Sequence, residues 1–171
     1  KAAAARANGE LGELDADTAE AICIASLDIA SGNHLDQFPV DVFQTGSGTS
    51  SNMNANEVIA SLASKHLQRP VHPNDHVNCS QSSNDVIPTA IHVSARLAIE
   101  DQLLPALGLL QSAIASREEE LHGQVKTGRT HLMDAMPISI SQELSAWRGQ
   151  LEQGQQRIVD TCQRLCQVAQ G

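Results

Sequence analysis

Aromatic residues are scarce in this chain, which has two Phe, one Trp and no Tyr among its 171 residues. Its hydrophobic residues, 41% of the total, are therefore mostly aliphatic and include many alanines. This composition is typical of helices packed on helices, because alanine lets helices approach closely although it buries little area. Such helices usually need neighbouring helices to cover their apolar sides. We therefore expect a mainly all-α fold that is stable as part of an assembly.

Basic residues and long apolar runs are also lacking. The chain has 11 Lys and Arg against 20 Asp and Glu, for a formal net charge of -9. Because the few basic residues form no run, we expect neither nucleic acid nor an anionic membrane surface as a partner. No stretch approaches the roughly 20 apolar residues of a membrane-spanning helix. The net charge does not exclude an anionic substrate, since hydrogen-bond donors around the ligand decide its binding.

Cysteine is present, but its pattern is not that of a metal site. The spacing of Cys23, Cys79, Cys162 and Cys166 matches no zinc motif. We interpret them as reduced thiols of a cytoplasmic protein, or of the mitochondrial matrix if the source is eukaryotic. The alternative is that the last two, four residues apart, bind a metal on one helical face. We expect no metal and no cofactor.

Helical patterns begin at the first residue. Lys1 to Ala5 has no capping residue ahead of it, so we expect an internal piece of a longer chain. Asp15 or Asp17 can cap a following helix, which residues 31–33, Ser-Gly-Asn, would end. The next helix is predicted from Met53 to Leu67, with Met53, Val58, Ile59 and Leu62 as its apolar side.

The second half of the chain predicts two long helices. The first should start near Pro88, because proline suits a first helical turn. Pro105 should bend that helix or mark a change of register. Residues 122–137 are expected to be irregular, and the last helix should start near Ile138. Leucine and isoleucine recur every seven residues in this last helix, which is typical of a bundle.

Three polar clusters stand out from this helical background. The first cluster is residues 44–52, Gln-Thr-Gly-Ser-Gly-Thr-Ser-Ser-Asn; the second is residues 78–85, Asn-Cys-Ser-Gln-Ser-Ser-Asn-Asp; the third is residues 127–131, Thr-Gly-Arg-Thr-His. The first two directly precede predicted helices. Glycine lets backbone N–H groups approach a ligand, and a helix N-terminus favours negative charge. Together the clusters predict a pocket for a small anion.

Each cluster also has a simpler interpretation. Ser and Asn before a helix are usually N-caps, and Gly-Ser-Gly-Thr is usually a turn. The first cluster is not a phosphate-binding loop, because no Gly-Lys-Ser/Thr follows. His131 could be structural, or it could transfer a proton to or from water. His72, Asn74 and Asp75 could form a second polar site or an Asx turn.

The three clusters, in this order, resemble the conserved regions of the fumarase/aspartase superfamily, and most closely those of the iron-free class II fumarases. The resemblance runs from residue 44 through residues 72–85 to residues 128–137. It implies a lyase that hydrates fumarate reversibly to L-malate through an aci-carboxylate carbanion. It implies that six residues bind the two substrate carboxylates: Ser47, Thr49, Ser82, Ser83, Asn84 and Thr130. His131 would be the catalytic group that acts on the water, and His72, Asn74 and Asp75 would line a second dicarboxylate site.

The resemblance also carries expectations for the whole assembly. The family forms helical homotetramers whose active sites are shared between subunits. Residues 1–87 would be the later part of the N-terminal domain, and residues 88–171 the first two long helices of the central bundle. The family's mobile loop, Gly-Ser-Ser-x-Met-Pro-x-Lys-x-Asn, is absent from these 171 residues. We therefore expect the chain alone to be inactive.

Two alternatives remain at this stage. The first is another lyase of the superfamily, such as aspartate ammonia-lyase. Aspartases typically carry Gln where this chain has His131, and Ser-Thr-Asn where it has Ser82-Ser83-Asn84, so both positions favour fumarase. The second is a non-catalytic helical assembly protein whose polar clusters are only caps.

Overall fold

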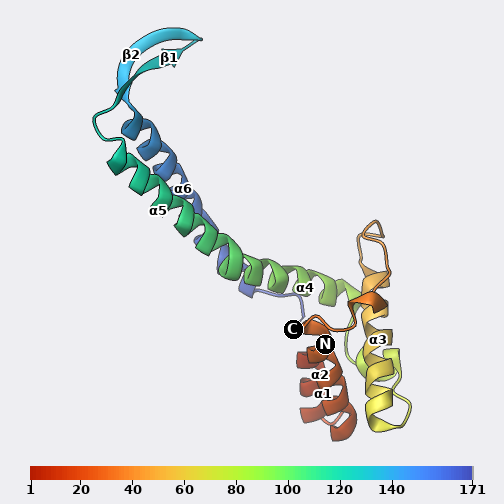
Figure 1. Ribbon diagram of the computed structural model, residues 1–171. Coiled ribbons are helices and arrows are strands. Elements are labelled where there is room, and N and C mark those ends of the chain that lie inside the picture. The colour runs from red at the N-terminus through yellow and green to blue at the C-terminus, as the bar shows by residue number, and fades with distance from the viewer. Residues whose placement is uncertain (171) are drawn as a thin grey trace. The chain divides into compact units, whose positions relative to one another are not determined.

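The computed structural model describes residues 1–170, and it is mainly helical, as predicted (Figure 1). The chain divides into two compact units, which are described separately. Unit 1 comprises Lys1–Ala90 together with the last residues from Val168, and unit 2 comprises Ile91–Gln167. No helix within residues 1–170 combines the length and the apolar character needed to cross a membrane.

Unit 1 begins with two packed helices and a third that packs on the second. Its elements are α1 (Ala2–Glu10), α2 (Ala16–Ala30), the short 3-10 helix η1 (Leu35–Gln37), α3 (Thr49–Leu67), the π-helical turn η2 (Pro73–Val77) and the first part of α4 (Ser83–Ala98). Asp15 is the N-cap of α2, where its carboxylate accepts from the Thr18 backbone N–H at 3.0 Å. The helix ends at Ser31, so both of its predicted limits are confirmed.

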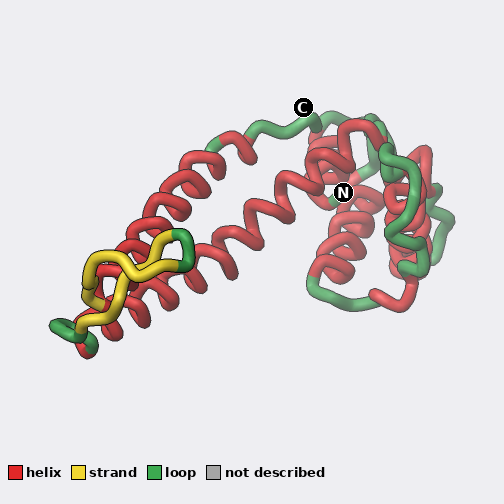
Figure 2. The backbone as a smooth tube through the Cα atoms, turned by 90° about the horizontal axis from the view of Figure 1, so that it is seen from above, coloured by secondary structure: helices red, strands yellow, loops and turns green. Residues whose placement is uncertain are grey.

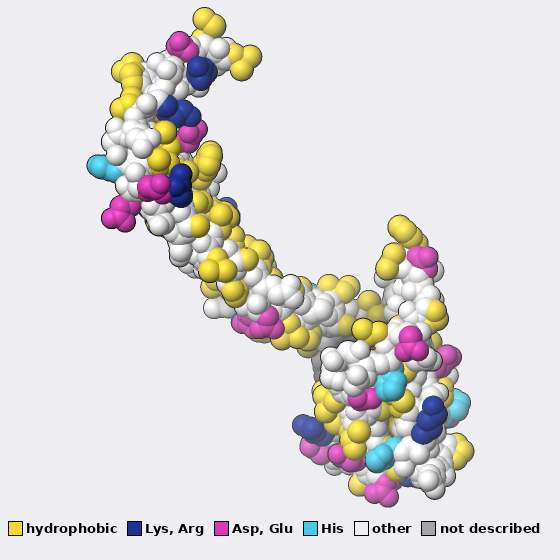
Figure 3. All heavy atoms as spheres, viewed as in Figure 1, with side chains coloured by type: hydrophobic (Ala, Val, Ile, Leu, Met, Phe, Trp, Pro, Cys, Tyr) yellow, Lys and Arg dark blue, Asp and Glu magenta, His cyan; other side chains and the backbone are white. Residues whose placement is uncertain are grey.

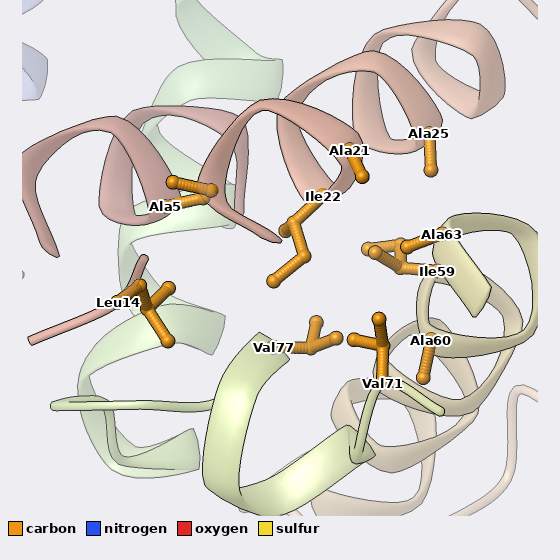
Figure 4. Packing of buried hydrophobic residues seen from close by; sticks show 11 residues of the cluster. Ala5, Leu14, Ala21, Ile22, Ala25, Ile59, Ala60, Ala63, Val71 and Val77 are labelled. Carbon is orange, nitrogen blue, oxygen red and sulfur yellow. The ribbon is translucent and has the colours of Figure 1, made fainter. Parts of the chain in front are cut away.

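The core of unit 1 is aliphatic and rich in alanine, as the composition predicts (Figure 4). It is built from α1, α2, α3 and the segment around η2, and its buried residues are Ala5, Leu14, Ala19, Ala21, Ile22, Ala25, Ile59, Ala60, Ala63, Val71 and Val77. Small side chains let α1 and α2 come close together. A Cβ added to Gly9 would lie only 2.8 Å from the Ala19 Cβ.

Helix α3 begins four residues before the predicted Met53, and its buried side differs from the prediction. Of the four residues predicted as its apolar side, only Ile59 is buried, and the other three are half-buried. Two polar residues, Asn52 and Asn56, are buried instead, with exposed fractions of 3% and 0%. Hydrogen bonds from these amides, described below, explain why polar groups occupy that side of the helix.

The predicted start of the next helix at Pro88 is wrong. Helix α4 begins at Ser83 and contains Pro88 in its second turn. At this position, beyond the first turn, proline removes one backbone hydrogen bond of the helix, the one to the Asn84 carbonyl. The Ser82 carbonyl oxygen accepts the first backbone hydrogen bonds of the helix, from the Asp85 N–H at 3.1 Å and the Val86 N–H at 2.9 Å.

Unit 2 consists of two long helices joined by a β-hairpin. Its elements are the rest of α4, the π-helical segment η3 (Ile99–Leu103), α5 (Leu104–Glu120), β1 (Val125–Thr130), β2 (Met133–Ser139), α6 (Ile140–Cys162) and the 3-10 turn η4 (Arg164–Cys166). Helices α5 and α6 pack side by side, with the hairpin between them in the chain (Figure 2). Pro105 lies in the first turn of α5, directly after η3, so the predicted change of register is confirmed.

The prediction of an irregular segment at residues 122–137 is wrong. Strands β1 and β2 form an antiparallel hairpin, with Val125 opposite Ser139 and Thr130 opposite Met133. The strands are largely exposed on both faces, so their sequences lack the alternation by which half-buried strands are recognised. Helix α6 then begins at Ile140 behind a Ser139 capping box, two residues after the predicted start.

Candidate functional site

The first polar cluster forms a turn that carries a row of hydroxyl groups into α3. The Ser47 Oγ lies 3.1 Å from the Thr45 Oγ1 and 3.2 Å from the Thr49 Oγ1. The turn is closed by a hydrogen bond from the Gly48 N–H to the Thr45 carbonyl at 3.0 Å. Ser47 and Thr49 are exposed, so their hydroxyls are available to a ligand.

Gly48 places this turn directly against α4. It has a φ of +61°, in the left-handed region, and a Cβ added to it would lie 2.9 Å from the Ile87 Cγ1. A residue with a side chain would be strained in this conformation and would also collide with Ile87. The close contact therefore brings the first polar cluster beside the start of α4, where the second cluster lies.

The second polar cluster supplies the N-terminus of α4. The Ser82 Oγ accepts from the Asn84 backbone N–H at 3.2 Å, so Ser82 caps the helix, as the simpler interpretation predicts. A capping hydroxyl keeps its own proton and can still donate it to a ligand. Ser83 and Asn84 lie in the first turn of α4, where the helix dipole favours an anion.

A network of buried amides joins the second cluster to α3. Asn52 donates from Nδ2 to the Ser83 Oγ at 2.9 Å and to the Asn78 Oδ1 at 3.2 Å. Asn56, one turn further along α3, donates to the same Asn78 oxygen at 3.1 Å. The Lys1 Nζ is a third donor to that oxygen, at 2.8 Å, and burial lowers the pKa of Lys1 to about 8.

Asn52 is the last residue of the first polar cluster, and Asn56 lies outside the three clusters. Polar residues at positions i and i+4 of a helix lie on one face, here the face that also carries the buried Ile59 and Ala60. Two asparagines that share a face with apolar residues are a signal of a buried hydrogen-bond network. The i, i+4 spacing of Asn52 and Asn56 is therefore the sequence signal of this network.

The third cluster ends at the tip of the β-hairpin. His131 and Leu132 are the two loop residues between paired Thr130 and Met133, and their φ values are 50° and 61°. Two successive positive φ values define the type I′ hairpin turn. The turn presents His131 and Thr130 as exposed side chains at the end of the hairpin.

The third cluster contains a glycine, Gly128, at a position that leaves no room for a side chain. It lies where the pairing register of the hairpin shifts, between Thr127 and Arg129. A Cβ at this position would lie 2.5 Å from the Met136 carbonyl oxygen. The irregular pairing near the tip therefore depends on the absence of a side chain.

His72, Asn74 and Asp75 lie in the turn that forms η2. The His72 Nδ1 lies 3.2 Å from both the backbone N and the Oδ2 of Asp75, and all three residues are exposed. The His72 N–H also donates to the His76 Nδ1 at 2.8 Å. The side chain of His72 therefore caps the turn, and its role in a second site remains a prediction.

The structure thus brings the first two clusters together within unit 1, and Thr130 and His131 belong to unit 2. Exposed hydroxyls beside a helix N-terminus suit the binding of a carboxylate by uncharged donors. Within residues 1–170, no group of three or more His, Cys, Asp or Glu side chains is placed to hold a metal ion. Cys23, Cys79, Cys162 and Cys166 are all free thiols.

The fold is thus mainly helical, with exposed hydroxyls beside the start of α4 and an exposed histidine at the hairpin tip. The model of a family described as lyase matches residues 1–171, and the chain belongs to that family. Its curated relatives include class II fumarate hydratases. One from Pseudomonas aeruginosa is 57% identical and one from Xylella fastidiosa is 56% identical, each over 171 residues and the whole of this chain. A third, from Halobacterium salinarum, is 52% identical over 176 residues.

Solved structures agree with this assignment. The class II fumarase of Schistosoma mansoni matches 99% of this chain with a TM-score of 0.94 and 40% sequence identity. A protein from Brucella melitensis described as a fumarate lyase:delta crystallin matches 98% of it with a TM-score of 0.90 and 44% identity. This chain covers 37% of the Schistosoma chain and 37% of the Pseudomonas relative. It thus spans little more than a third of their length.

Proposed function

We propose that this chain is part of a fumarate hydratase, an enzyme that adds water reversibly to fumarate to form L-malate. The observation that carries this proposal is the match to class II fumarate hydratases at more than half identity over all 171 residues. A match of this extent includes all three polar clusters. Membership of the lyase family supports the same class of reaction.

The difficult step of this reaction is the formation of charge beside a carboxylate. Removal of the proton next to that group creates a dianionic aci-carboxylate, which hydrogen-bond donors placed in advance stabilise. We assign this task to short polar side chains, which bring no mobile counter-charge: Ser47, Thr49, Ser82, Ser83, Asn84 and Thr130. The contact between Gly48 and Ile87 supports the joint action of the first two clusters.

His131 is the proposed catalytic residue of this chain. An imidazole can both accept and donate a proton, so it can take a proton from the attacking water or return one to the leaving hydroxyl. Its position at the tip of a hairpin supports this role, because an exposed tip can enter a pocket formed by other segments. His72, Asn74 and Asp75 are proposed to line a second dicarboxylate site, separate from the reacting one.

We propose a homotetramer in which subunits share active sites. Hydrophobic side chains lie at the surface of the long helices (Figure 3). Several large ones on α4, α5 and α6 are more than a third exposed in this chain, among them Ile91, Leu97, Leu109, Leu110 and Trp147. Exposed apolar side chains in such number favour burial against further helices. We propose that residues 1–87 belong to an N-terminal domain and residues 88–171 to a central bundle.

The free thiols are consistent with a reducing compartment. We therefore propose a cytoplasmic location, or the mitochondrial matrix in a eukaryotic source. Nucleic acid is not among the proposed partners, given the net charge of -9.

The function is tested by assaying the intact protein, which includes this chain, with malate and with aspartate in separate reactions. A fumarate hydratase forms fumarate, detected by its absorbance, from malate and releases no ammonia from aspartate. Turnover of aspartate instead would identify an ammonia-lyase. A well-folded intact protein that converts neither substrate would favour the non-catalytic assembly protein. The 171-residue chain alone is expected to be inactive, since the family's mobile loop is absent from it.

A further inference from the structure

We propose that Asn52 is a positioning residue that directs the Ser83 hydroxyl, so that Ser83 donates its proton to a carboxylate of the substrate. This inference rests on the proposed function, because it takes Ser83 as one of the groups that bind the dicarboxylate. It adds a residue inside α3 that touches no substrate and acts through its hydrogen bond to Ser83.

The orientation of the network is set at Asn78. Its Nδ2 donates to the Gln81 carbonyl at 3.0 Å, and its Oδ1 accepts from the Lys1 Nζ at 2.8 Å. A backbone carbonyl can only accept, and a lysine ammonium can only donate. The Asn78 amide is therefore fixed from both ends, with its oxygen directed toward α3.

This oxygen in turn orients the two asparagines of α3. Asn52 and Asn56 direct their Nδ2 groups to it, at 3.2 Å and 3.1 Å. The opposite orientation would bring oxygen against oxygen. The Oδ1 atoms of Asn52 and Asn56 are buried and find no hydrogen-bond partner among the described residues. The hydrogen bonds to the Asn78 Oδ1 therefore fix the orientation of both amides.

The second N–H of Asn52 makes the Ser83 hydroxyl a hydrogen-bond acceptor. It points to the Ser83 Oγ at 2.9 Å, so this hydroxyl is an acceptor in the direction of α3. A serine hydroxyl has a single proton, and a group that accepts on one side is left to donate on another. Ser83 is half-buried in the first turn of α4, beside the first polar cluster. Its proton is thus kept for an anion bound at that helix start.

The test uses the intact enzyme and a double-mutant cycle between Asn52 and Ser83. Asn52→Leu keeps the approximate shape of the side chain, adds no charge and removes both N–H groups. We expect it to raise the KM for fumarate about 10-fold, the effect of weakening one hydrogen bond to a charged group, with a smaller change in kcat. In a Ser83→Ala background the same change should alter KM by less than about 2-fold, because the hydroxyl it directs is gone.

A matched control is Asn54→Leu. Asn54 lies on the same helix but donates to the Gln37 carbonyl at 2.9 Å, so its replacement should leave KM unchanged. If Asn52→Leu does not fold, Asn52→Ala serves in the same cycle. It also removes both N–H groups and adds no charge near the bound dicarboxylate. Its effect on KM should shrink at least about 5-fold in the Ser83→Ala background.

The outcomes separate this inference from the proposed function. If Ser83→Ala raises KM and the effect of Asn52→Leu disappears in that background, Asn52 acts through Ser83. An equal effect of Asn52→Leu with and without the Ser83 hydroxyl would show a purely structural role and overturn the inference, while the proposed function would stand. An unchanged KM in Ser83→Ala would overturn both the inference and the assignment of Ser83 to the site.

Discussion

At the scale of single residues, the candidate site depends on small groups that set the positions of larger ones. Gly48 allows the first cluster to approach Ile87, Gly128 allows the irregular pairing of the hairpin, and Asn52 orients Ser83. The sequence identified the polar clusters themselves, since short polar residues and glycines are visible by composition. It could not show that the first two clusters are neighbours, because a tertiary contact across about 40 residues leaves no local signal.

Gly48 offers a direct test of that contact. Gly48→Ala should destabilise the intact protein by about 2–4 kcal/mol, because the left-handed conformation costs about 1–2 kcal/mol for a residue with a side chain and the collision with Ile87 adds to it. Gly46→Ala is the control. A Cβ there meets nothing within 4 Å, so its effect should stay within about 0.5 kcal/mol. Equal urea-unfolding midpoints for the two variants would contradict the contact.

At the scale of elements, the sequence predicts the start of α2 correctly from its capping side chain. The Asp15 carboxylate accepts from the Thr18 backbone N–H, as the sequence suggests. The hairpin could not be predicted, because its turn residues are His131 and Leu132 and not the Asn-Gly or Asp-Gly pairs that usually mark a type I′ turn. The start of α4 was placed too late because Pro88 lies inside the helix.

The cap of α2 predicts a dependence of stability on pH. Hydrogen bonds from Thr18, with a further contribution from Arg69, lower the pKa of Asp15 to about 2. The unfolded chain binds this proton near pH 3.9, so the stabilisation is present above about pH 4 and is lost as the pH falls toward 2. Because the side chain is more than half exposed, we expect it to contribute only about 1 kcal/mol.

Two substitutions separate the charge of Asp15 from its capping bond. Asp15→Asn keeps a good N-cap but lacks the charge, so it should be about 1 kcal/mol less stable than wild type at neutral pH, and this difference should vanish as the pH falls to about 2. Asp15→Ala removes the cap as well as the charge and should cost about 2 kcal/mol at neutral pH. The measurement is the free energy of unfolding in urea between about pH 2 and pH 7. Wild type and Asp15→Asn with identical pH profiles would refute the role of the charge.

At the scale of the whole molecule, unit 2 leaves apolar side chains for other helices to cover. Leu109 on α5 is 74% exposed in this chain. In the proposed homotetramer, Leu109→Asp would bring a charge into a helix interface, and we expect the intact protein to sediment as smaller species. Leu109→Met keeps the apolar character and should assemble normally. Sedimentation of Leu109→Asp at the wild-type mass would argue against burial of this side chain.

A substitution of His131→Asn in the intact protein tests whether this chain contributes a catalytic histidine to a fumarate-hydrating site. Asparagine tolerates the left-handed conformation of this turn position, so the melting temperature should be unchanged. The measurement is the steady-state hydration of fumarate. We predict turnover by the wild type and a kcat at least about 100-fold lower in the variant, the usual effect of losing a general acid–base group. Wild-type turnover in His131→Asn would show that His131 is not the catalytic group, and no hydration of fumarate by the intact wild type would show that the protein is not a fumarate hydratase.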